Sequence, residues 1–432
     1  MNFKPKGLLF ILFVALYNLI GILPNYGAID RIDTQWLALS ILNLLGLIYI
    51  SANYNSFEIS IKKALNFKPF LLLVLFTVWG LLSYFYAENS VEVIIKSFRW
   101  FNVALAILIS CCLLDELKNA FLYVAIILSS ILLIQLYFSY STFFQITEFT
   151  NFDFKFSNLL RGASANKNIG AASILIKVPF LFYLLSRTKN LYIRIGLSIL
   201  LYSSLYLIFL LSARSAVIAV ALVLSIYIIY VFLQFYHSRS IKQLVPSICY
   251  VIAPALLSIG FFQLNYSSLS EVSLINRATT INTEDTSTKQ RIRFYEYAFN
   301  HTVNNPVIGV GLGNWKIKSI DYDKNYVTGY TAPYFVHNDF LEFAAELGLI
   351  GFFLYLSIFG YMLFFVVKTL FKKDTSGGEI GPKSLILLIG GVIYFVDANL
   401  NFPHARLLMQ LPFIFYVALF FLTHTKTQNE KA

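Results

Sequence analysis

Charged residues are scarce in this chain of 432 residues. They make up 13% of it, whereas an ordinary soluble domain has roughly 25%. Hydrophobic residues reach 58%, and the mean hydropathy is +0.69. This composition excludes a soluble globular domain, and we predict an all-α polytopic membrane protein surrounded by the lipid bilayer.

Cysteine is also rare, and no metal-binding spacing is present. Cys111, Cys112 and Cys249 all lie in apolar runs, which is typical of packing residues. We therefore expect neither a metal nor another cofactor. The net charge of +11 is not arranged as a Lys/Arg stripe with interleaved aromatic residues, so we expect no nucleic-acid partner. Internal repeats and paired broken helices are missing as well, which disfavours a transporter.

What the chain has in abundance is apolar runs long enough to cross a bilayer. The first of these lacks a small-residue cleavage site, so we interpret it as a retained helix. The run from Ile195 to Tyr236 is too long for one helix, and we divide it at Ser212-Ala213-Arg214-Ser215. About twelve spans result, at 7–23, 35–52, 69–86, 98–114, 119–140, 168–186, 191–211, 214–236, 244–264, 338–371, 384–400 and 406–424.

The distribution of Lys and Arg between the loops predicts the orientation. With both termini in the cytoplasm, the cytoplasmic segments carry 17 basic residues and the short external segments carry eight, among them Lys96 and Arg99. We expect three parts: a bundle of about nine helices over 1–264, an external loop over 265–336, and a bundle of about three helices over 337–432. Within the loop, the capping-box spacing of Ser287-Thr288-Lys289-Gln290 predicts a helix that ends at Asn304-Asn305-Pro306.

A polar stretch, HNDFLEFAAELGLIG, opens the tenth predicted span. It contains His337, Asp339, Glu342 and Glu346, and the two glutamates share one helix face. Ionisable groups at membrane depth are costly and usually mark a functional site. The alternative interpretation is that His337 is an interfacial residue without a catalytic role.

Several arginines are predicted on the same, external side as His337. A guanidinium group matches phosphate oxygens and stays charged, so this set suits a diphosphate carried on a lipid. A neutral histidine at a helix N-terminus beside such a diphosphate can accept a proton from a hydroxyl group. The external arginines are Arg99, Arg161, Arg214, Arg277, Arg291, Arg293 and Arg406.

Three blocks of sequence resemble the O-antigen ligase and polymerase superfamily of bacterial membrane glycosyltransferases. The first is Leu211-Ser212-Ala213-Arg214-Ser215. The second runs from Arg291 through Tyr295, Ala298 and Pro306 to Gly309-Val310-Gly311-Leu312-Gly313-Asn314. The third is formed by His337-Asn338, Leu341, Glu346, Gly348 and Gly351. Position 295 is Tyr where the family often has Trp.

This resemblance implies a GT-C-like helical fold in the bacterial inner membrane, with a periplasmic active site. It implies that Arg214 and Arg291 hold the diphosphate of an undecaprenyl-linked glycan while His337 activates an acceptor hydroxyl, in a metal-independent, inverting reaction. The expected substrate-binding residues are Arg161, Asn166, Asn168, Lys177, Arg293, Asn338, Asp339, Glu342, Glu346 and Arg406.

For some of these residues a second interpretation stays open. The turn with Arg161, Asn166 and Asn168 is either a substrate contact or an interfacial turn with a capping Asn. Lys177 either contacts the lipid carrier or pairs with a buried carbonyl, and Arg406 either snorkels or contacts the diphosphate. We expect His404 to be a weaker base candidate than His337. We also expect His301 to be solvated and Trp315 to be available to stack on sugar rings.

The resulting functional hypothesis is a glycan ligase. It transfers a glycan from undecaprenyl diphosphate to an acceptor hydroxyl on lipid A-core or a similar molecule. A repeat-unit polymerase and a protein O-oligosaccharyltransferase of the same superfamily are alternatives that the sequence does not separate. A transporter of the lipid-linked glycan is a less favoured alternative.

Overall fold

The structure, a computed structural model, describes residues 5–24, 26–27, 32–147, 152–239, 241–266, 286–326, 334–370 and 381–429. Throughout these ranges all regular secondary structure is helical. Eleven helical segments of the described chain are long and apolar enough to cross a membrane, and α1 (Pro5–Ile20) adds a shorter apolar helix. The predicted class of all-α polytopic membrane protein is confirmed.

The spanning segments follow the predicted order along the chain. They are α2 (Asp33–Ala52), α4 (Lys68–Leu82) with η1 (Ser83–Phe85), α5 (Ser90–Asp115), α6 (Ala120–Ile146), α7 (Lys167–Leu175) with α8 (Val178–Arg187), α9 (Leu191–Leu211), α10 (Arg214–Ser238), α11 (Ile241–Ser247) with the π-turn η3 (Ile248–Ile252) and α12 (Ala253–Tyr266), α16 (Asp339–Leu370), α17 (Pro382–Leu400) and α18 (Leu407–Asn429). The remaining elements are α3 (Tyr54–Leu65), η2 (Phe154–Arg161), α14 (Thr286–Asn304), α15 (Trp315–Asp323) and η4 (Pro403–Ala405).

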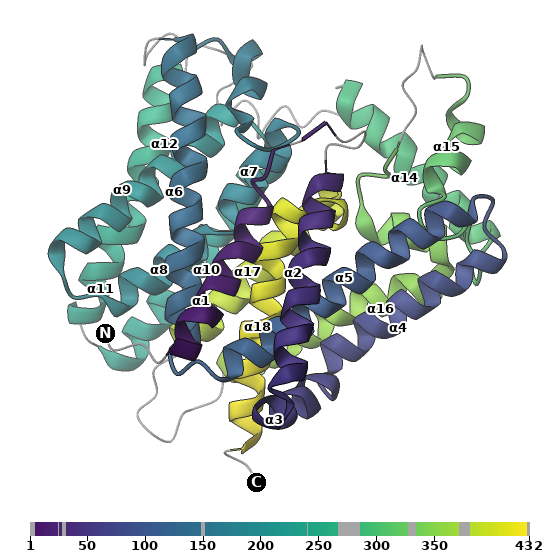
Figure 1. Ribbon diagram of the computed structural model, residues 1–432. Helices are drawn as coiled ribbons and strands as arrows, with labels where there is room; N and C mark the ends of the chain where they lie inside the picture. Colours follow the sequence, from purple (N-terminus) through teal and green to yellow (C-terminus); the bar gives the residue numbers. More distant parts are fainter. Residues whose placement is uncertain are drawn as a thin grey trace.

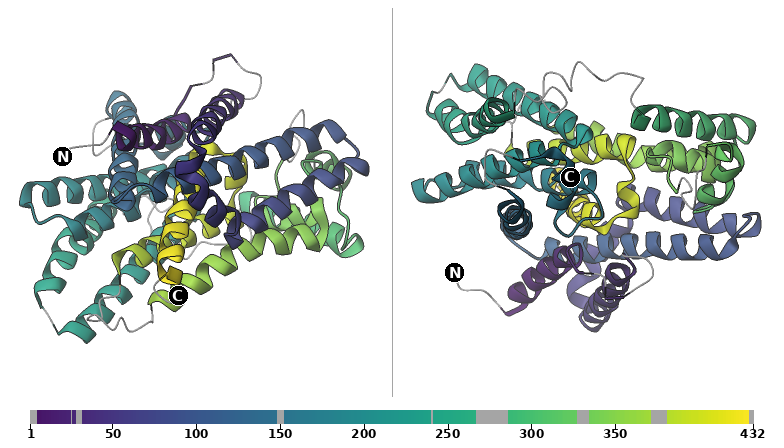
Figure 2. Two further views of the ribbon diagram at one scale, coloured as in Figure 1. Left: turned by 60° about the horizontal axis from the view of Figure 1, so that its bottom comes forward. Right: turned by 90° about the horizontal axis from the view of Figure 1, so that it is seen from above.

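The helices form two groups with α17 and α18 between them (Figures 1 and 2). One group contains α6 and α8 to α12, and the other contains α4, α5 and α16 lying side by side. Helices α14 and α15 lie at one end of the molecule, whereas α3 and the last turns of α18 lie at the other end (Figure 1). We call the first of these the α14/α15 end.

Helix α5 begins eight residues before the predicted span at 98–114. The side chain of Asn89 caps it by accepting hydrogen bonds from the N–H groups of Val91 and Glu92. A hydropathy window misses these first turns because they are polar. Lys96 therefore belongs to the helix, whereas the predicted span boundary had placed it in the preceding loop.

The division of the long apolar run at Ser212 is confirmed. Ser212 adopts a left-handed backbone conformation, with φ at 57°, between the last residue of α9 and the first residues of α10. This turn places Arg214 at the start of α10. The predicted loop helix is confirmed as well, since α14 covers the residues from Thr286 to Asn304.

Helix α16 is interrupted at Gly348, where φ is 67° and ψ is −172°. The break frees backbone groups, and the loop after α14 binds them. Val310 and Gly311 donate to the carbonyls of Ala345 and Glu346 at 3.1 and 2.8 Å, and Leu349 donates to the carbonyl of Pro306 at 2.8 Å. The glycine-rich loop is thereby docked on the broken helix.

The predicted span at 168–186 consists of two helices, α7 and α8, and Lys177 lies at the break between them. The Lys177 side chain is 1% exposed, and its ammonium group donates to the carbonyl of Ser173. The structure thus gives Lys177 the contact with a buried carbonyl that the sequence left as one of two interpretations.

Candidate active site

The last turn of α17 and the residues after it connect the elements that carry the predicted catalytic residues. The side chain of Asn401 donates to Oγ of Ser215 at 3.1 Å, which ties this segment to the start of α10. Arg291 of α14 donates through Nη1 to the carbonyl of Leu400 at 2.9 Å. The Tyr295 hydroxyl lies 3.1 Å from the carbonyl oxygen of His337 and 3.2 Å from that of Asn399. Four chain segments distant in sequence therefore meet here.

Arg214 is exposed and lies beside the first turns of α14. Its Nη1 is 3.5 Å from Oγ1 of Thr288, which precedes Arg291 by about one turn on the same helix. The two arginines predicted to hold a diphosphate are thus neighbours at the α14/α15 end. The sequence alone did not establish this proximity, because α10 and α14 are separated by about fifty residues.

His337 is half-buried and has an unusual backbone conformation, with φ at 64°. It precedes Asn338, whose Oδ1 caps α16 by accepting from the N–H groups of Phe340 and Leu341. The imidazole contacts the ring of Phe402 edge-on, with 5.1 Å between centroids. Among the described residues, its Nδ1 has no hydrogen-bond partner. A non-glycine residue held at positive φ is characteristic of functional sites.

The surroundings of His337 keep its imidazole neutral. Burial is the main cause, and the positive charge of Arg291 adds to it. Together they lower the pKa of His337 to about 4. The side chain therefore has an unprotonated ring nitrogen over the physiological pH range, as a proton acceptor requires.

The three carboxylates of the polar stretch are buried, and within the described residues they contact backbone N–H groups and His404 and not the arginines that the sequence suggested as partners. Oε2 of Glu342 accepts from the N–H of Val336 at 2.9 Å, so it holds the residue before His337. Oε1 of Glu346 accepts from the N–H of Trp315 at 3.2 Å, so it fixes the start of α15. Both glutamates thus position the loops around His337.

Asp339 pairs with His404, a residue to which the sequence analysis gave little weight. Nδ1 of His404 lies 2.8 Å from Oδ1 of Asp339, and its Nε2 lies 3.5 Å from Oε1 of Glu342. Burial is the largest influence on His404 and lowers its pKa to about 4. The signal available in the sequence was a histidine in the short polar break between two apolar runs on the external side.

A cavity of about 950 Å³ opens beside His337. Its volume falls in the range of sites that bind small molecules. Predicted site residues that line it are Arg293, His337, Glu342, Glu346 and Arg406, together with Lys96, Arg99, Lys316, Tyr326, Tyr334, Phe335 and Phe402. Arg214 and Arg291 are not part of this lining, so His337 lies at the boundary between the cavity and the arginine pair.

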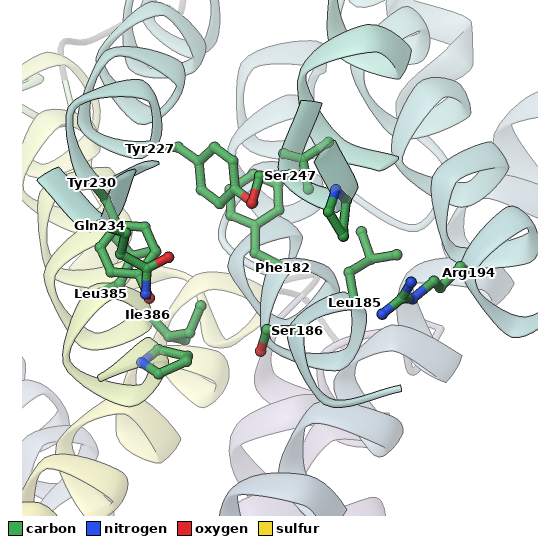
Figure 3. A pocket seen from close by; sticks show the side chains of 13 residues that line it. Phe182, Leu185, Ser186, Arg194, Tyr227, Tyr230, Gln234, Ser247, Leu385 and Ile386 are labelled. Atoms are coloured by element: carbon green, nitrogen blue, oxygen red, sulfur yellow. The ribbon is translucent and has the colours of Figure 1, made fainter. Parts of the chain in front are cut away.

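A second, smaller cavity of about 260 Å³ lies among the opposite ends of α8, α9, α10 and α17. Figure 3 shows its polar side chains spread around the wall, with Arg194 at one side and Gln234 at the other. Arg194 donates to the carbonyl of Thr188 and stacks on Tyr250. None of the predicted site residues lines this cavity.

The turn at 161–168 has the geometry of a capped helix start. Arg161 donates to the carbonyl of Ala165 at 3.0 Å, and Oδ1 of Asn166 accepts from the N–H of Ile169 at 3.0 Å, which caps α7. Asn168 is half-buried in the first turn of α7. Ile169 and Ala165 pack in a cluster with Phe402, so the turn adjoins the ring that contacts His337.

Two expectations about aromatic residues are wrong. Trp315 is 1% exposed and stacks on Tyr322, so it is not available to a sugar ring. His301 is 5% exposed instead of solvated, and its Nδ1 lies 3.1 Å from the hydroxyl of Tyr322. Both residues belong to a small aromatic cluster between α14 and α15, which the sequence pattern did not indicate because it joins two separate helices.

Arg406 and Arg293 both line the cavity. The guanidinium of Arg406 lies 5.3 Å from the ring of Phe402, which it shares with His337. Arg293 forms an ion pair with Asp323 at 2.8 Å and stacks on Tyr326 at 4.1 Å. In the described part of the chain, no group of three or more His, Cys, Asp or Glu side chains is arranged to hold a metal ion.

Residues 198–356 match a family model described as O-antigen ligase. This match supports the resemblance to the O-antigen ligase and polymerase superfamily that the three sequence blocks indicated. No curated protein matches this chain. The matched O-antigen ligase region extends from α9 into α16 and includes Arg214, Arg291 and His337, whereas Lys96, His404 and Arg406 lie outside it. Members of this superfamily are membrane glycosyltransferases, ligases or polymerases, that act on lipid-linked glycans.

Proposed function

We propose that this protein is an O-antigen ligase-like glycosyltransferase that moves a glycan from undecaprenyl diphosphate to an acceptor hydroxyl. The observation that supports this proposal best is the position of His337. It lies between Arg291, whose charge influences it, and a cavity large enough for a saccharide. The site would lie on the periplasmic side of the inner membrane, with both termini in the cytoplasm.

In the proposed reaction, Arg214 and Arg291 bind the diphosphate of the donor. His337 accepts the proton of the acceptor hydroxyl, and the acceptor oxygen forms a bond to the anomeric carbon of the donor glycan. The bond from that carbon to the diphosphate oxygen breaks, and its electron pair leaves with undecaprenyl diphosphate. The arginines stabilise the leaving charge in the transition state.

The geometry also supports a division of the site between two substrates. The exposed Arg214 and its neighbour Arg291 suit the charged donor. The cavity on the other side of His337 has aromatic walls and equal numbers of basic and acidic residues. Such a lining suits a hydroxyl-rich acceptor, for which rings provide flat apolar contact and paired charges provide hydrogen bonds.

A transfer assay tests the proposal directly. Purified protein is mixed with a lipid-linked glycan and a panel of defined acceptors, and the glycosylated product is measured. We expect His337→Ala and Arg291→Ala to lower the transfer rate by about 100-fold or more, the typical contribution of a general base or a charge-stabilising group. Lys289→Ala, which removes an exposed cation from the same helix α14, serves as the matched control. Transfer by both site variants at the rate of the control would contradict the mechanism.

The acceptor distinguishes the ligase from a polymerase or a protein O-oligosaccharyltransferase. A strain that lacks the protein separates the first two. Accumulated lipid-linked polymer without attachment indicates a ligase, and decoration with single repeat units indicates a polymerase. A transporter would instead leave the lipid-linked glycan on the cytoplasmic face and show no transfer in the purified assay.

A further inference from the structure

Five basic residues line the large cavity, and three of them are neutralised by a close carboxylate. The pairs are Arg99 with Asp33 at 2.8 Å, Arg293 with Asp323 at 2.8 Å, and Lys316 with Glu92 at 2.6 Å. These cations are held in the cavity wall by their partners. Each would have to give up part of an existing ion pair to bind a ligand.

Lys96, on α5, differs from these three. Within the described residues, its ammonium has neither a hydrogen-bond acceptor nor a carboxylate within 4.0 Å. The ammonium nitrogen of Lys96 lies 5.8 Å from the centroid of the Phe335 ring. Glu342 and Glu346 influence it from a greater distance, and their carboxylates already accept from the backbone of Val336 and Trp315.

The position of Lys96 is fixed by close packing of its stem. A Cβ atom at Gly313 would lie 2.6 Å from Cγ of Lys96, and Gly313 has a φ of 78°. The glycine-rich loop therefore passes directly against the aliphatic part of the lysine. This contact orders the stem of Lys96, and the residue lines both the large cavity and a small pocket with Trp36, Trp100 and His404.

We propose that Lys96 is a substrate-binding residue whose ammonium group binds a phosphate group inside the cavity. A lysine acts on phosphate as a compact point charge with three donors. The stem of Lys96 is already ordered, so binding costs less side-chain entropy than it would for a free surface lysine. The phosphate belongs either to the lipid-linked donor or to the acceptor glycan. The donor assignment rests on the proposed function, whereas phosphate binding by Lys96 does not.

The test is a binding measurement on the purified full chain in a neutral detergent, read by native mass spectrometry. Two probes are used separately: undecaprenyl diphosphate, and glucose 6-phosphate as a sugar phosphate without a lipid. The variant Lys96→Met keeps the stem and removes the charge. Lys318→Met is the matched control, because Lys318 of α15 is paired with Asp321 at 2.8 Å and does not line the cavity. Thermal unfolding of each variant verifies that it is folded. A second variant, Lys96→Arg, retains the positive charge that Lys96→Met removes.

We expect Lys96→Met to raise the Kd of one probe by about tenfold or more, the value of a lost charge-assisted hydrogen bond. Lys318→Met is expected to change the Kd of either probe by less than about threefold. If Lys96→Met binds undecaprenyl diphosphate more weakly than wild type, the phosphate belongs to the donor. If it binds glucose 6-phosphate more weakly, the phosphate belongs to the acceptor. Equal binding of both probes by wild type and Lys96→Met overturns this inference and leaves the proposed function intact. Wild-type protein that binds only glucose 6-phosphate, in a Lys96-dependent way, contradicts the proposed donor and supports the role of Lys96.

Discussion

At the scale of single residues, His337 has a different role from the two glutamates that follow it, Glu342 and Glu346. Glu342 and Glu346 accept hydrogen bonds from the backbone of neighbouring loops. His337 has an unpartnered Nδ1 in the described chain and borders the cavity. Buried polar groups are nearly always satisfied, so the unpartnered nitrogen of His337 points to a ligand, whereas the satisfied glutamates point to structural support.

The first prediction concerns the pH dependence of transfer. His337 must be neutral to accept a proton, and its pKa is lowered to about 4 by burial and by Arg291. We therefore expect kcat/KM to be constant from neutral pH down to about 5 and to fall about tenfold per pH unit below about 4. Bound diphosphate brings negative charge close to the imidazole and raises the pKa of His337 in the substrate complex. The fall of kcat at acidic pH, its acidic limb, should therefore lie at higher pH than that of kcat/KM.

A substitution at Arg291 provides the matching test. Arg291→Gln removes the positive charge that lowers the pKa of His337, so the acidic limb of the residual activity should move to higher pH. The shift is partial, because burial is the larger cause. Lys289→Gln on the same helix should leave the limb in place. If the activities of wild type and Arg291→Gln fall at the same acidic pH, another group accepts the proton.

At the scale of secondary-structure elements, the interruption of α16 is the feature on which the site depends. The freed carbonyls of Ala345 and Glu346 bind the loop from Pro306 to Gly311, and this loop leads into α15. The glycines of the motif serve this contact. A Cβ at Gly309 would lie 2.2 Å from the carbonyl oxygen of Ala345, and one at Gly348 would lie 2.3 Å from that of Val307.

The second prediction is that Gly348→Ala destabilises the protein and lowers transfer. Alanine at a φ of 67° and a ψ of −172°, a region essentially restricted to glycine, costs about 1–3 kcal/mol, and its Cβ would displace the docked loop. We expect a lower midpoint of thermal unfolding in detergent and faster proteolysis after α14. Gly360→Ala lies in the same helix with no atom within 4 Å of its added Cβ. That control should be neutral or slightly stabilising, since alanine favours a helix over glycine. Equal midpoints for both variants would contradict the structural role of Gly348.

At the scale of the whole molecule, the charged and aromatic site lies at the α14/α15 end, and the last turns of α18 lie at the other end (Figure 1). This arrangement accords with the orientation expected from the Lys and Arg residues of the loops. The division into the parts 1–264, 265–336 and 337–432 stays a prediction. In the structure, α16 from the third part packs against α4 from the first part.

The third prediction tests this orientation with a single accessible cysteine. Cys249 is exposed and is first replaced by serine, whereas Cys111 and Cys112 are buried and unreactive. Lys289→Cys, on the exposed face of α14, should then react in intact spheroplasts with a maleimide that cannot cross the membrane. A cysteine appended at the C-terminus should react only after the membrane is opened. The reverse pattern would place the site in the cytoplasm and remove access to a periplasmic acceptor.

Hydrophobicity and local pattern settled the helical membrane class, the order of the spans, the turn at Ser212 and the helix α14, because each follows from residues close together in the chain. The polar stretch that opens the tenth predicted span singled out His337, and the resemblance to the superfamily singled out Arg214 and Arg291. Sequence patterns did not indicate the contact of α17 with these residues, the pairing of His404 with Asp339, or the position of Lys96 in the cavity wall. Those features join segments that are far apart in the chain, and only the packing of the helices decided which polar groups satisfy one another and which border the cavity.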